Sequence, residues 1–480
     1  MKNFNWIILI LSFSVFGSNM AESKSNSSRK QHKNDVQCWL TSPTSNILFQ
    51  KQDTGLKFGP VAASGPVIEV NETQTFQTID GFGNCLTDGS AELMHKMSPG
   101  ARTALLKELF ATDGNNIGIS YLRISLGASD LSRECYSYND LRSGESDFEL
   151  KKFSIEPARK DLIPVLKEIL KINPTIKILA SPWSAPTWMK NNNNFKGGSL
   201  KTECFEVYAN YFVRYIQEMK KEGIPIDAIT IQNEPLHPGN TPSMLMLPED
   251  QGLFVKQNLG PAFRTAGLAT KIIIYDHNAD KISYPLTILR DPEAAKYVDG
   301  SAFHLYGGKI EALADVHKEF PGKNLYFTEQ WVGAPGKLAT DLAWHTKTLI
   351  IGATRNWCRN VIEWNMASDP AWDPHTIGGC DRCLGTVTLD GDKATRNPAY
   401  YILAHAAKFV RPGSVRIESS VVPDLPNVAF ATTEGKIVLI VLNDSPNQIK
   451  FSIGYKGKSV LAEMDKGSVG TFVWNKNKGR

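Results

Sequence analysis

Eight short apolar runs, separated by stretches with helical periodicity, constrain the fold of this 480-residue chain more than any other feature. Apolar residues recur every three or four positions between the runs, as in Glu156–Ile172 and Cys204–Lys221, which is typical of amphipathic helices. The predicted strands are Thr78–Gly81, Tyr121–Ser125, Lys177–Ala180, Ala228–Ile231, Lys271–Tyr275, Gly300–His304, Asn324–Thr328 and Asn360–Glu363. Eight strands alternating with helices predict an α/β fold, a closed (β/α)8 TIM barrel.

An open, doubly wound sheet is the alternative arrangement of alternating strands and helices. Such a sheet often carries a Gly-x-Gly-x-x-Gly phosphate turn after its first strand. That turn is missing between the first predicted strand and its helix. The barrel is therefore the favoured architecture.

The pattern changes to strand-like segments separated mostly by Gly, Asp, Asn or Pro from about residue 403. These segments are Ser414–Ser419, Val428–Thr432, Lys436–Leu442, Ile449–Ile453, Val460–Met464 and Gly470–Trp474. They predict a small all-β sandwich. The strand Val67–Val70 precedes the barrel and has no helix after it, so we expect it to join the sandwich and make that domain discontinuous. The alternating segment that begins there is expected to end in a glycine-rich turn at Gly81–Gly83.

The N-terminus has the three-part build of a secretory signal peptide. Lys2 precedes the apolar run Trp6–Phe16, and small residues follow it. A run of about eleven residues is too short to span a bilayer, so we expect export and no integral membrane segment in the mature chain. The predicted divisions are a signal peptide (1–21), a disordered leader (22–36), a segment contributing to the sandwich (37–75), the catalytic barrel (76–402) and the sandwich (403–480).

Composition narrows the class of protein further. With 42% hydrophobic and 21% charged residues and a formal net charge of +4, the chain has the composition of a soluble globular protein. It lacks a basic stripe with interleaved aromatic residues, which argues against nucleic acid as a partner. The pair Cys380 and Cys383 has no second pair at zinc-ligand spacing, so a local disulfide or an inert loop is favoured over a metal site. No metal and no cofactor are predicted.

Two of the predicted strands lead to a glutamate, Glu234 and Glu329. The C-terminal ends of barrel strands surround one mouth, so residues that follow different strands become neighbours in space. The predicted rim is rich in carboxylates, amides and indoles, which suits sugar hydroxyls and sugar C–H faces. Its members are Asp130, Trp183, Trp188, Asn233, Glu234, Asp276, His277, His304, Tyr306, Glu329, Trp331, Trp364 and Asn365. Two carboxylates at strand ends are the minimum equipment for glycosidic bond cleavage.

Seven motifs along the chain resemble glycoside hydrolase family 30, the glucosylceramidase (acid β-glucosidase) family, which includes β-1,6-glucanases. They are QTIDGFGNCLTD (77–88), YLRISLGASD (121–130), LASPWSAPTWMK (179–190), TIQNEP (230–235), DPEAAKYVDGSAFHLY (291–306), FTEQW (327–331) and EWN (363–365). The similarity runs in order from about Phe76 to the last strands of the sandwich.

This resemblance implies a retaining hydrolysis with Glu234 as the acid/base and Glu329 as the nucleophile. The two carboxyl groups should then lie roughly 5 to 5.5 Å apart. Glu234 must begin protonated, so we expect its pKa to be raised by its negative neighbour and by partial burial. Asn233 is expected to contact the 2-hydroxyl of the sugar. The residues expected to contact the glucosyl ring are Asp130, Trp183 and Trp364.

Three further residues are expected to support the carboxylates. Arg123 lies within a strand, where a buried guanidinium would orient them, and Tyr306 would donate to Glu329. His304 is expected to act with Tyr306, and both are also candidates for substrate binding. Outer subsites are expected around Trp188, His237, Asp276, His277 and Trp331.

The substrate remains open between a glycolipid and a polysaccharide. Gln330 and Trp331 after the nucleophile, and Leu305 after His304, differ from the mammalian glucosylceramidases at positions that would affect aglycone recognition. The leading hypothesis is an exported, glucosylceramidase-like retaining hydrolase of β-glucosidic bonds. An endo-β-1,6-glucanase is the first alternative. A non-catalytic carbohydrate-binding protein on the same scaffold is the second, and the presence of both glutamates argues against it.

Overall fold

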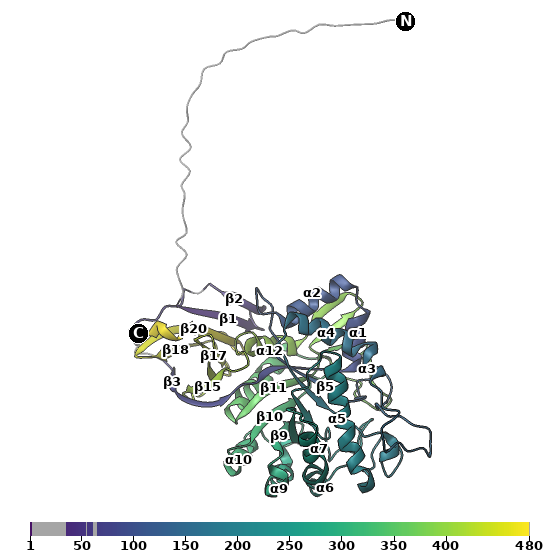
Figure 1. Ribbon diagram of the computed structural model, residues 1–480. Coiled ribbons are helices and arrows are strands. Elements are labelled where there is room, and N and C mark those ends of the chain that lie inside the picture. The colour runs from purple at the N-terminus through teal and green to yellow at the C-terminus, as the bar shows by residue number, and fades with distance from the viewer. Residues whose placement is uncertain (2–34, 54, 61–64, 480) are drawn as a thin grey trace, which may run out of the picture. The chain divides into compact units, whose positions relative to one another are not determined.

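The computed structural model describes residues 1, 35–53, 55–60 and 65–479 (Figure 1). Apart from Met1, the predicted signal peptide lies outside these residues, as does the predicted leader up to residue 34. From residue 35 onward the chain forms one compact unit. Its first strand begins at Val36, the last residue of the predicted leader. Among the described residues, no helix has both the length and the apolar composition that crossing a bilayer requires.

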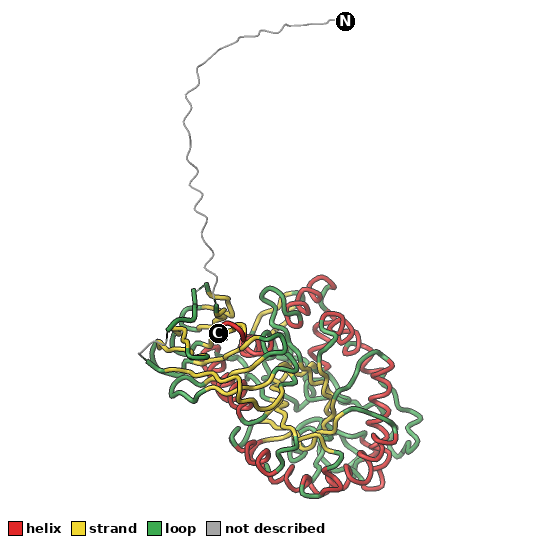
Figure 2. The backbone as a smooth tube through the Cα atoms, turned by 60° about the vertical axis from the view of Figure 1, so that its left-hand side comes forward, coloured by secondary structure: helices red, strands yellow, loops and turns green. Residues whose placement is uncertain are grey.

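Eight parallel strands close into a barrel in sequence order, which confirms the predicted fold class. They are β4 (Gly81–Leu86), β5 (Tyr121–Ser125), β6 (Lys177–Ser181), β7 (Ala228–Thr230), β8 (Lys271–Asn278), β9 (Val298–His304), β10 (Asn324–Glu329) and β11 (Cys358–Asn365). Helices lie around the outside of these strands (Figure 2). The carboxyl ends of the eight strands therefore share one mouth.

The first barrel strand is not where the sequence pattern placed it. The prediction put it at Thr78–Gly81 with a turn at Gly81–Gly83, whereas β4 runs from Gly81 to Leu86 and Thr78 ends a strand of the sandwich. A Cβ added at Gly83 would lie 1.9 Å from the carbonyl oxygen of Tyr121 in the neighbouring strand. This glycine therefore permits a close approach between two strands, and it was misread as a turn signal.

The described residues also form twelve α-helices, four 3-10 helices and two π-helices, η3 and η5. The α-helices are α1 (Asp88–Lys96), α2 (Pro99–Phe110), α3 (Glu156–Lys160), α4 (Leu162–Ile172), α5 (Phe205–Lys221), α6 (Pro248–Phe254), α7 (Gly260–Thr265), α8 (Ser283–Leu289), α9 (Pro292–Ala295), α10 (Ala312–Glu319), α11 (Leu338–His345) and α12 (Pro398–Ala407). The 3-10 and π-helices are η1 (Thr187–Met189), η2 (Thr202–Cys204), η3 (Val255–Leu259), η4 (Ala279–Lys281), η5 (Thr346–Ala353) and η6 (Lys476–Gly479). The single helix predicted at Glu156–Ile172 is two helices, because the chain breaks at Asp161, whose carboxylate lies 2.8 Å from His95 of α1.

The remaining strands form a nine-stranded sheet and a small three-stranded sheet. The large sheet contains β1 (Val36–Ser42), β2 (Ile47–Gln52), β3 (Val67–Thr78), β15 (Val415–Ser419), β16 (Asn427–Ala431), β17 (Lys436–Leu442), β18 (Ile449–Tyr455), β19 (Lys458–Met464) and β20 (Val469–Asn475), and the small sheet contains β12 (Ala367–Ser368), β13 (Val387–Asp390) and β14 (Lys393–Arg396). β3 pairs with β15 and β18. The predicted discontinuity of the sandwich is thus confirmed, with β1 and β2 as further N-terminal members.

A buried histidine connects the last barrel helix to the sandwich. His405 of α12 places Nδ1 2.9 Å from the hydroxyl of Thr471 in β20 and Nε2 2.8 Å from the hydroxyl of Thr41 in β1. The Thr471 hydroxyl itself donates to the backbone carbonyl of His405, so it accepts from Nδ1–H. Burial lowers the pKa of His405 to about 3, so the imidazole is neutral at neutral pH and its Nε2 accepts from the Thr41 hydroxyl.

Acid should weaken this connection. The pKa of His405 is about 3 in the folded chain, against an ordinary value of about 6.5, so its contribution to stability is complete above about pH 6.5 and is lost as the pH falls toward 3. We expect the free energy of unfolding to drop by about 2 kcal/mol from this group between pH 7.5 and pH 5. Urea unfolding at both pH values measures the drop. A His405→Gln variant, which keeps one donor and one acceptor but cannot titrate, should lose that part of the pH dependence; an equal drop in both proteins would contradict this prediction.

Candidate active site

The loop after β7 presents Glu234 in a left-handed backbone conformation, with φ of 44°. Such a conformation costs a non-glycine residue roughly 1–3 kcal/mol and persists only where the surroundings hold it. Here the backbone N–H of Asn233 donates to the backbone carbonyl of Pro182 at 2.8 Å. The backbone N–H of Glu234 donates to the backbone carbonyl of Asp276 at 3.0 Å. Neighbouring barrel loops therefore hold the backbone that carries this carboxylate.

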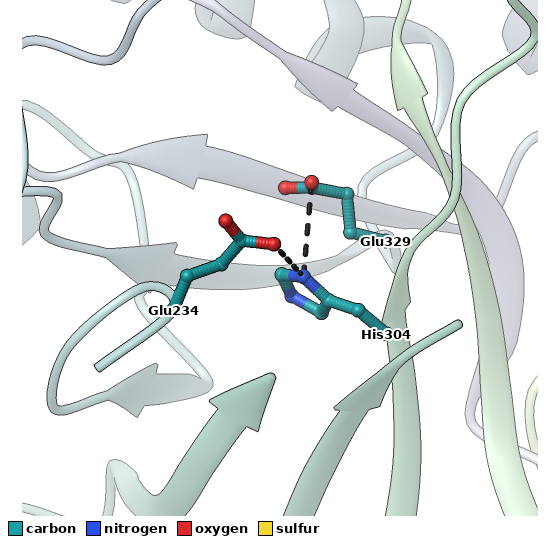
Figure 3. A group of neighbouring side chains, drawn as sticks. All are labelled: Glu234, His304 and Glu329. Carbon is teal, nitrogen blue, oxygen red and sulfur yellow. Dashed lines mark hydrogen bonds and ion pairs between the residues drawn. The ribbon is translucent and has the colours of Figure 1, made fainter. Parts of the chain in front are cut away.

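Glu329 is the last residue of β10 and faces Glu234 across the mouth, with His304 of β9 between them (Figure 3). One oxygen of each carboxylate and Nδ1 of His304 lie within 4.8 Å of one another. Nδ1 is 3.1 Å from Glu234 and 3.7 Å from Glu329. The structure thus brings together the two glutamates predicted from strand ends almost a hundred residues apart, at a separation suited to retaining hydrolysis.

Arg123 of β5 is fully buried beneath these groups. Its guanidinium donates to Glu329 Oε2 at 2.5 Å and to Asn233 Oδ1 at 2.7 Å, and Nε donates to Ser181 Oγ at 3.1 Å. The guanidinium carbon also lies 4.8 Å from the centre of the Trp183 ring. Arg123 thus makes charge-assisted hydrogen bonds to both the nucleophile candidate Glu329 and the side-chain amide of Asn233, the contacts that an orienting role requires.

Asp276 occupies a different place from the outer subsite predicted for it. Its carboxylate is fully buried and accepts from Arg123 at 2.8 Å. Its other donors are the hydroxyls of Thr230 and Thr328, each at 2.6 Å, and His304 Nε2 lies 3.1 Å away. Burial acts to raise the pKa of Asp276, but Arg123 and these donors hold that pKa well below its usual range. Asp276 is therefore an internal anion that anchors Arg123 and His304.

His304 carries the proton that the site needs. Its ring is fully buried, with one nitrogen toward Asp276 and the other toward Glu234. Burial alone would lower the pKa of His304, but the surrounding carboxylates of Glu329, Asp276 and Glu234 raise that pKa to about 9. At neutral pH the imidazolium therefore carries a proton on Nδ1, which lies 3.1 Å from Oε1 of Glu234.

The pKa values of the two glutamates differ from the sequence-based expectation. Burial acts to raise the pKa of Glu234, but the charged His304 outweighs it and lowers that pKa. Burial, together with the negative charge of Glu234, raises the pKa of Glu329 despite His304 and Arg123. These pKa directions favour a proton on His304, within hydrogen-bonding distance of Glu234, over a proton on Glu234 itself.

Tyr306 follows β9 and donates its hydroxyl to Glu329 Oε1 at 2.9 Å, as predicted. Each oxygen of Glu329 therefore has a donor, since Arg123 bonds Oε2. Tyr306 as a whole residue is 42% exposed, so it also offers a surface at the mouth. Two donors on one carboxylate favour its ionised form, which a nucleophile requires.

The three residues predicted to contact the sugar ring are deep in the site. Asp130 is buried, and within the described chain its Oδ1 has no hydrogen-bond partner. Burial and then the charge of Glu329 raise the pKa of Asp130 to about 7. Trp183 and Trp364 pack on each other with ring centres 5.4 Å apart, and they are 1% and 4% exposed. Both indoles thus serve as packing around Arg123, while Asp130 offers an unused acceptor.

The remaining rim candidates fall into two groups. In the first group, His237 is exposed and Trp331 is half-buried, and Nε2 of His277 lies 4.0 Å from Oε1 of Glu234. These three residues lie at the mouth. Trp188 is buried and donates its indole N–H to Asn139 Oδ1 at 2.8 Å, which makes it part of the loop packing. The hydroxyls of Ser181, Thr230 and Thr328 were missed by sequence reasoning; their only signal is that they stand near the ends of barrel strands.

Glu234, His304 and Glu329 also form a group with the ligand types of a metal site. The donor set does not fit one, because both nitrogens of His304 face carboxylates and an imidazolium with a pKa of about 9 offers no lone pair at neutral pH.

Two facing carboxylates at the mouth of a (β/α)8 barrel, one held by an arginine and a tyrosine, define a retaining glycosidase. Comparison with known families identifies it further. Residues 79–410 match the Glycosyl hydrolase family 30 TIM-barrel domain, and residues 413–472 match the Glycosyl hydrolase family 30 beta sandwich domain. The chain belongs to glycosyl hydrolase family 30, as the sequence motifs predicted.

Relatives cover nearly the whole chain. An endo-1,6-beta-D-glucanase of Neurospora crassa is 35% identical over 417 residues, 83% of this chain and 85% of that protein. The lysosomal acid glucosylceramidase of Mus musculus is 30% identical over 438 residues, 86% of this chain and 84% of that protein. Among solved structures, the endo-beta1,6-glucanase BT3312 superposes with a TM-score of 0.85 at 34% identity, covering 92% of this chain and all of that one.

Proposed function

We propose that this chain cleaves β-1,6-linked glucan internally by double displacement, with Glu329 as nucleophile and Glu234 as acid/base. The observation that carries the mechanism is the pair of carboxylate oxygens within 4.8 Å of each other, with His304 between them. The choice of glucan is supported by the similarity to endo-1,6-glucanases. Trp331, half-buried two residues after Glu329, supports it further, because an indole beside the nucleophile suits a second sugar ring.

In the first step, Glu329 attacks the anomeric carbon and the bond to the leaving glucosyl oxygen breaks. Arg123 and Tyr306 favour the ionised form of Glu329 against the effect of its burial, and their hydrogen bonds aim the carboxylate at the mouth. Glu234 delivers a proton to the leaving oxygen, and His304 supplies that proton along the 3.1 Å contact. The products are a glycosyl-enzyme ester and the shortened glucan chain.

In the second step, Glu234 is ionised and takes a proton from water, which attacks the same carbon and releases Glu329. Asn233 assists both steps. Its Oδ1 accepts from Arg123, which orients Nδ2 to donate to the 2-hydroxyl of the sugar. Asp130 Oδ1 is available to accept a hydrogen bond from another hydroxyl of the same ring.

A glucosylceramide-like glycolipid is the second candidate substrate, because the mouse glucosylceramidase is nearly as similar in sequence.

Export to the cell surface, the periplasm or the medium accompanies either candidate. It is supported by Lys2 and the apolar run Trp6–Phe16 at the start of the sequence.

Substrate panels separate these candidates. The protein is incubated in parallel with a linear β-1,6-glucan (pustulan), glucosylceramide and an aryl β-glucoside, and products are resolved by chromatography. We expect a ladder of β-1,6-linked oligosaccharides from the glucan. Free glucose alone from the glucan would contradict endo action, ceramide release alone would favour the glycolipid, and no product from any substrate would contradict the proposed function.

A further inference from the structure

The segment Thr376–Leu384, called the disulfide loop from here on, crosses the barrel mouth and is closed by a bond between Cys380 and Cys383. Its backbone reaches residues that follow two different barrel strands. The bonds are Thr376 N to Asp130 O at 2.9 Å, Ala334 N to Arg382 O at 2.8 Å and Leu384 N to Val332 O at 3.2 Å. One end of the loop therefore lies against the loop after β5, and the other end lies against the loop after β10.

The first end packs directly on Asp130. A Cβ added at Gly379 would lie 2.4 Å from the carbonyl oxygen and 3.1 Å from the Cβ of Asp130, so only glycine allows this approach. The hydroxyl of Thr376 donates to the carbonyl of Thr241 at 2.5 Å, which ties the same end to the loop after β7. The backbone that carries the unpartnered carboxylate oxygen of Asp130 is thus held from two sides.

The second end packs on the tryptophan pair. Cys383 is 1% exposed and belongs to a buried cluster with Cys85, Leu131, Trp183 and Trp364. Cys380 and Trp331 are partly buried against the same cluster. The disulfide therefore joins the Asp130 end of the loop to the end that packs around Trp183 and Trp364.

The catalytic carboxylates are held by other means. Glu329 is bonded by Arg123 and Tyr306, and Glu234 lies against His304; none of these side chains belongs to the disulfide loop. Opening the disulfide gives the loop more conformations and removes a constraint on Asp130. Substrate binding must then order Asp130, and the cost of that ordering reduces the binding free energy. The carboxylates stay in place.

We propose that the Cys380–Cys383 disulfide is a positioning element of the glucosyl-binding pocket, so that its reduction weakens substrate binding while the rate of the bound complex is preserved. This inference rests on the proposed function, in which Asp130 contacts the sugar. Reduction is chemically simple: a dithiol such as dithiothreitol supplies two electrons and two protons, the S–S bond becomes two thiols, and the reagent closes into a cyclic disulfide. The half-buried Cys380 sulfur is the accessible one.

The test compares KM and kcat for β-1,6-glucan oligosaccharides before and after dithiothreitol treatment, with thiol titration to confirm reduction. All seven cysteines lie in the described part of the chain, and the other five are free thiols, so this bond is the target. We expect KM to rise roughly fivefold to tenfold, because substrate binding must now immobilise about one side chain that the disulfide had held in place. We expect kcat to stay within about twofold and reoxidation to restore KM.

Two variants serve as matched controls. A Cys380→Ser/Cys383→Ser double variant should show the raised KM without reductant and no response to it. A Cys135→Ser variant removes a partly exposed free thiol and should respond to reductant as the wild type does. An unchanged KM in protein whose bond is shown to be reduced would overturn the inference, as would a fall in kcat without a rise in KM.

Failure of the proposed function has a separate signature. In that case the untreated protein cleaves no glucoside, and oligosaccharide affinity is measured instead by calorimetry on the oxidised and reduced protein. Weaker binding after reduction would still support the role of the disulfide. Equal binding, or no binding in either state, would overturn it.

Discussion

Replacing Glu329 by glutamine is expected to lower kcat/KM for every β-glucoside by about 10⁴-fold or more, the scale on which loss of a covalent nucleophile acts in other enzymes. Glutamine keeps the shape of the side chain, so Tyr306 and Arg123 retain one acceptor between them. The amide cannot attack the anomeric carbon, and no glycosyl-enzyme ester forms. Initial rates with an aryl β-glucoside and with β-1,6-glucan measure the loss.

The matched control is Glu222→Gln, which removes a carboxylate that pairs with Arg159 and Lys167 beyond the end of α5. It should keep wild-type rates. Both variants should unfold at temperatures close to that of the wild type. Activity of Glu329→Gln within about tenfold of wild type would remove Glu329 from the nucleophile role and with it the double displacement.

Glu234→Ala should separate substrates by their leaving groups. For β-1,6-glucan, whose leaving alkoxide needs a proton, kcat/KM should fall by about 10² to 10⁴-fold, the usual contribution of general acid catalysis. For a dinitrophenyl β-glucoside the first step needs no proton, so the glycosyl-enzyme should form rapidly and then accumulate, because the base for water is missing. Added azide, which needs no base, should restore turnover. Equal losses for both substrates would contradict the acid/base assignment.

The pH profile supplies an independent test of the same assignment. His304 holds the proton of the site, and the pKa of His304 is raised to about 9, so wild-type cleavage of the glucan should decline as the pH rises through about 9. With the dinitrophenyl substrate and Glu234→Ala, formation of the glycosyl-enzyme should lose that alkaline decline, because the proton is no longer required. Rapid-mixing measurements between pH 6 and 10 follow this step.

Much of this protein could be predicted from local patterns. Apolar runs and helical spacing located seven of the eight barrel strands, and turn residues located the C-terminal strands of the sandwich but not β1 and β2. The position of Glu234 and Glu329 beyond strand ends was enough to predict a shared mouth, because parallel barrel strands all finish on one face. The family motifs named the chemistry. They left open whether the substrate is a glycolipid or a glucan.

Other features became visible only in three dimensions. Asp276 follows the pattern of a rim residue, yet it is a buried anion beneath Arg123 and His304. Gly83 looks like part of a turn, yet it lies where β4 and β5 almost touch. The local disulfide favoured for Cys380 and Cys383 is present, but only the structure shows that its loop contacts Asp130 and the tryptophan pair. Spacing along the chain carries no information about which distant side chains become neighbours.

The sequence by itself determined the barrel, the discontinuous sandwich and the two glutamates, because periodicity and strand order are local properties that a linear pattern preserves. Only the tertiary structure decided where the proton of the site resides. That depends on the distances from His304 to the carboxylates of Glu234, Glu329 and Asp276, and on how deeply each of them is buried. Electrostatic energy in a buried site is a property of assembled groups and of no single residue.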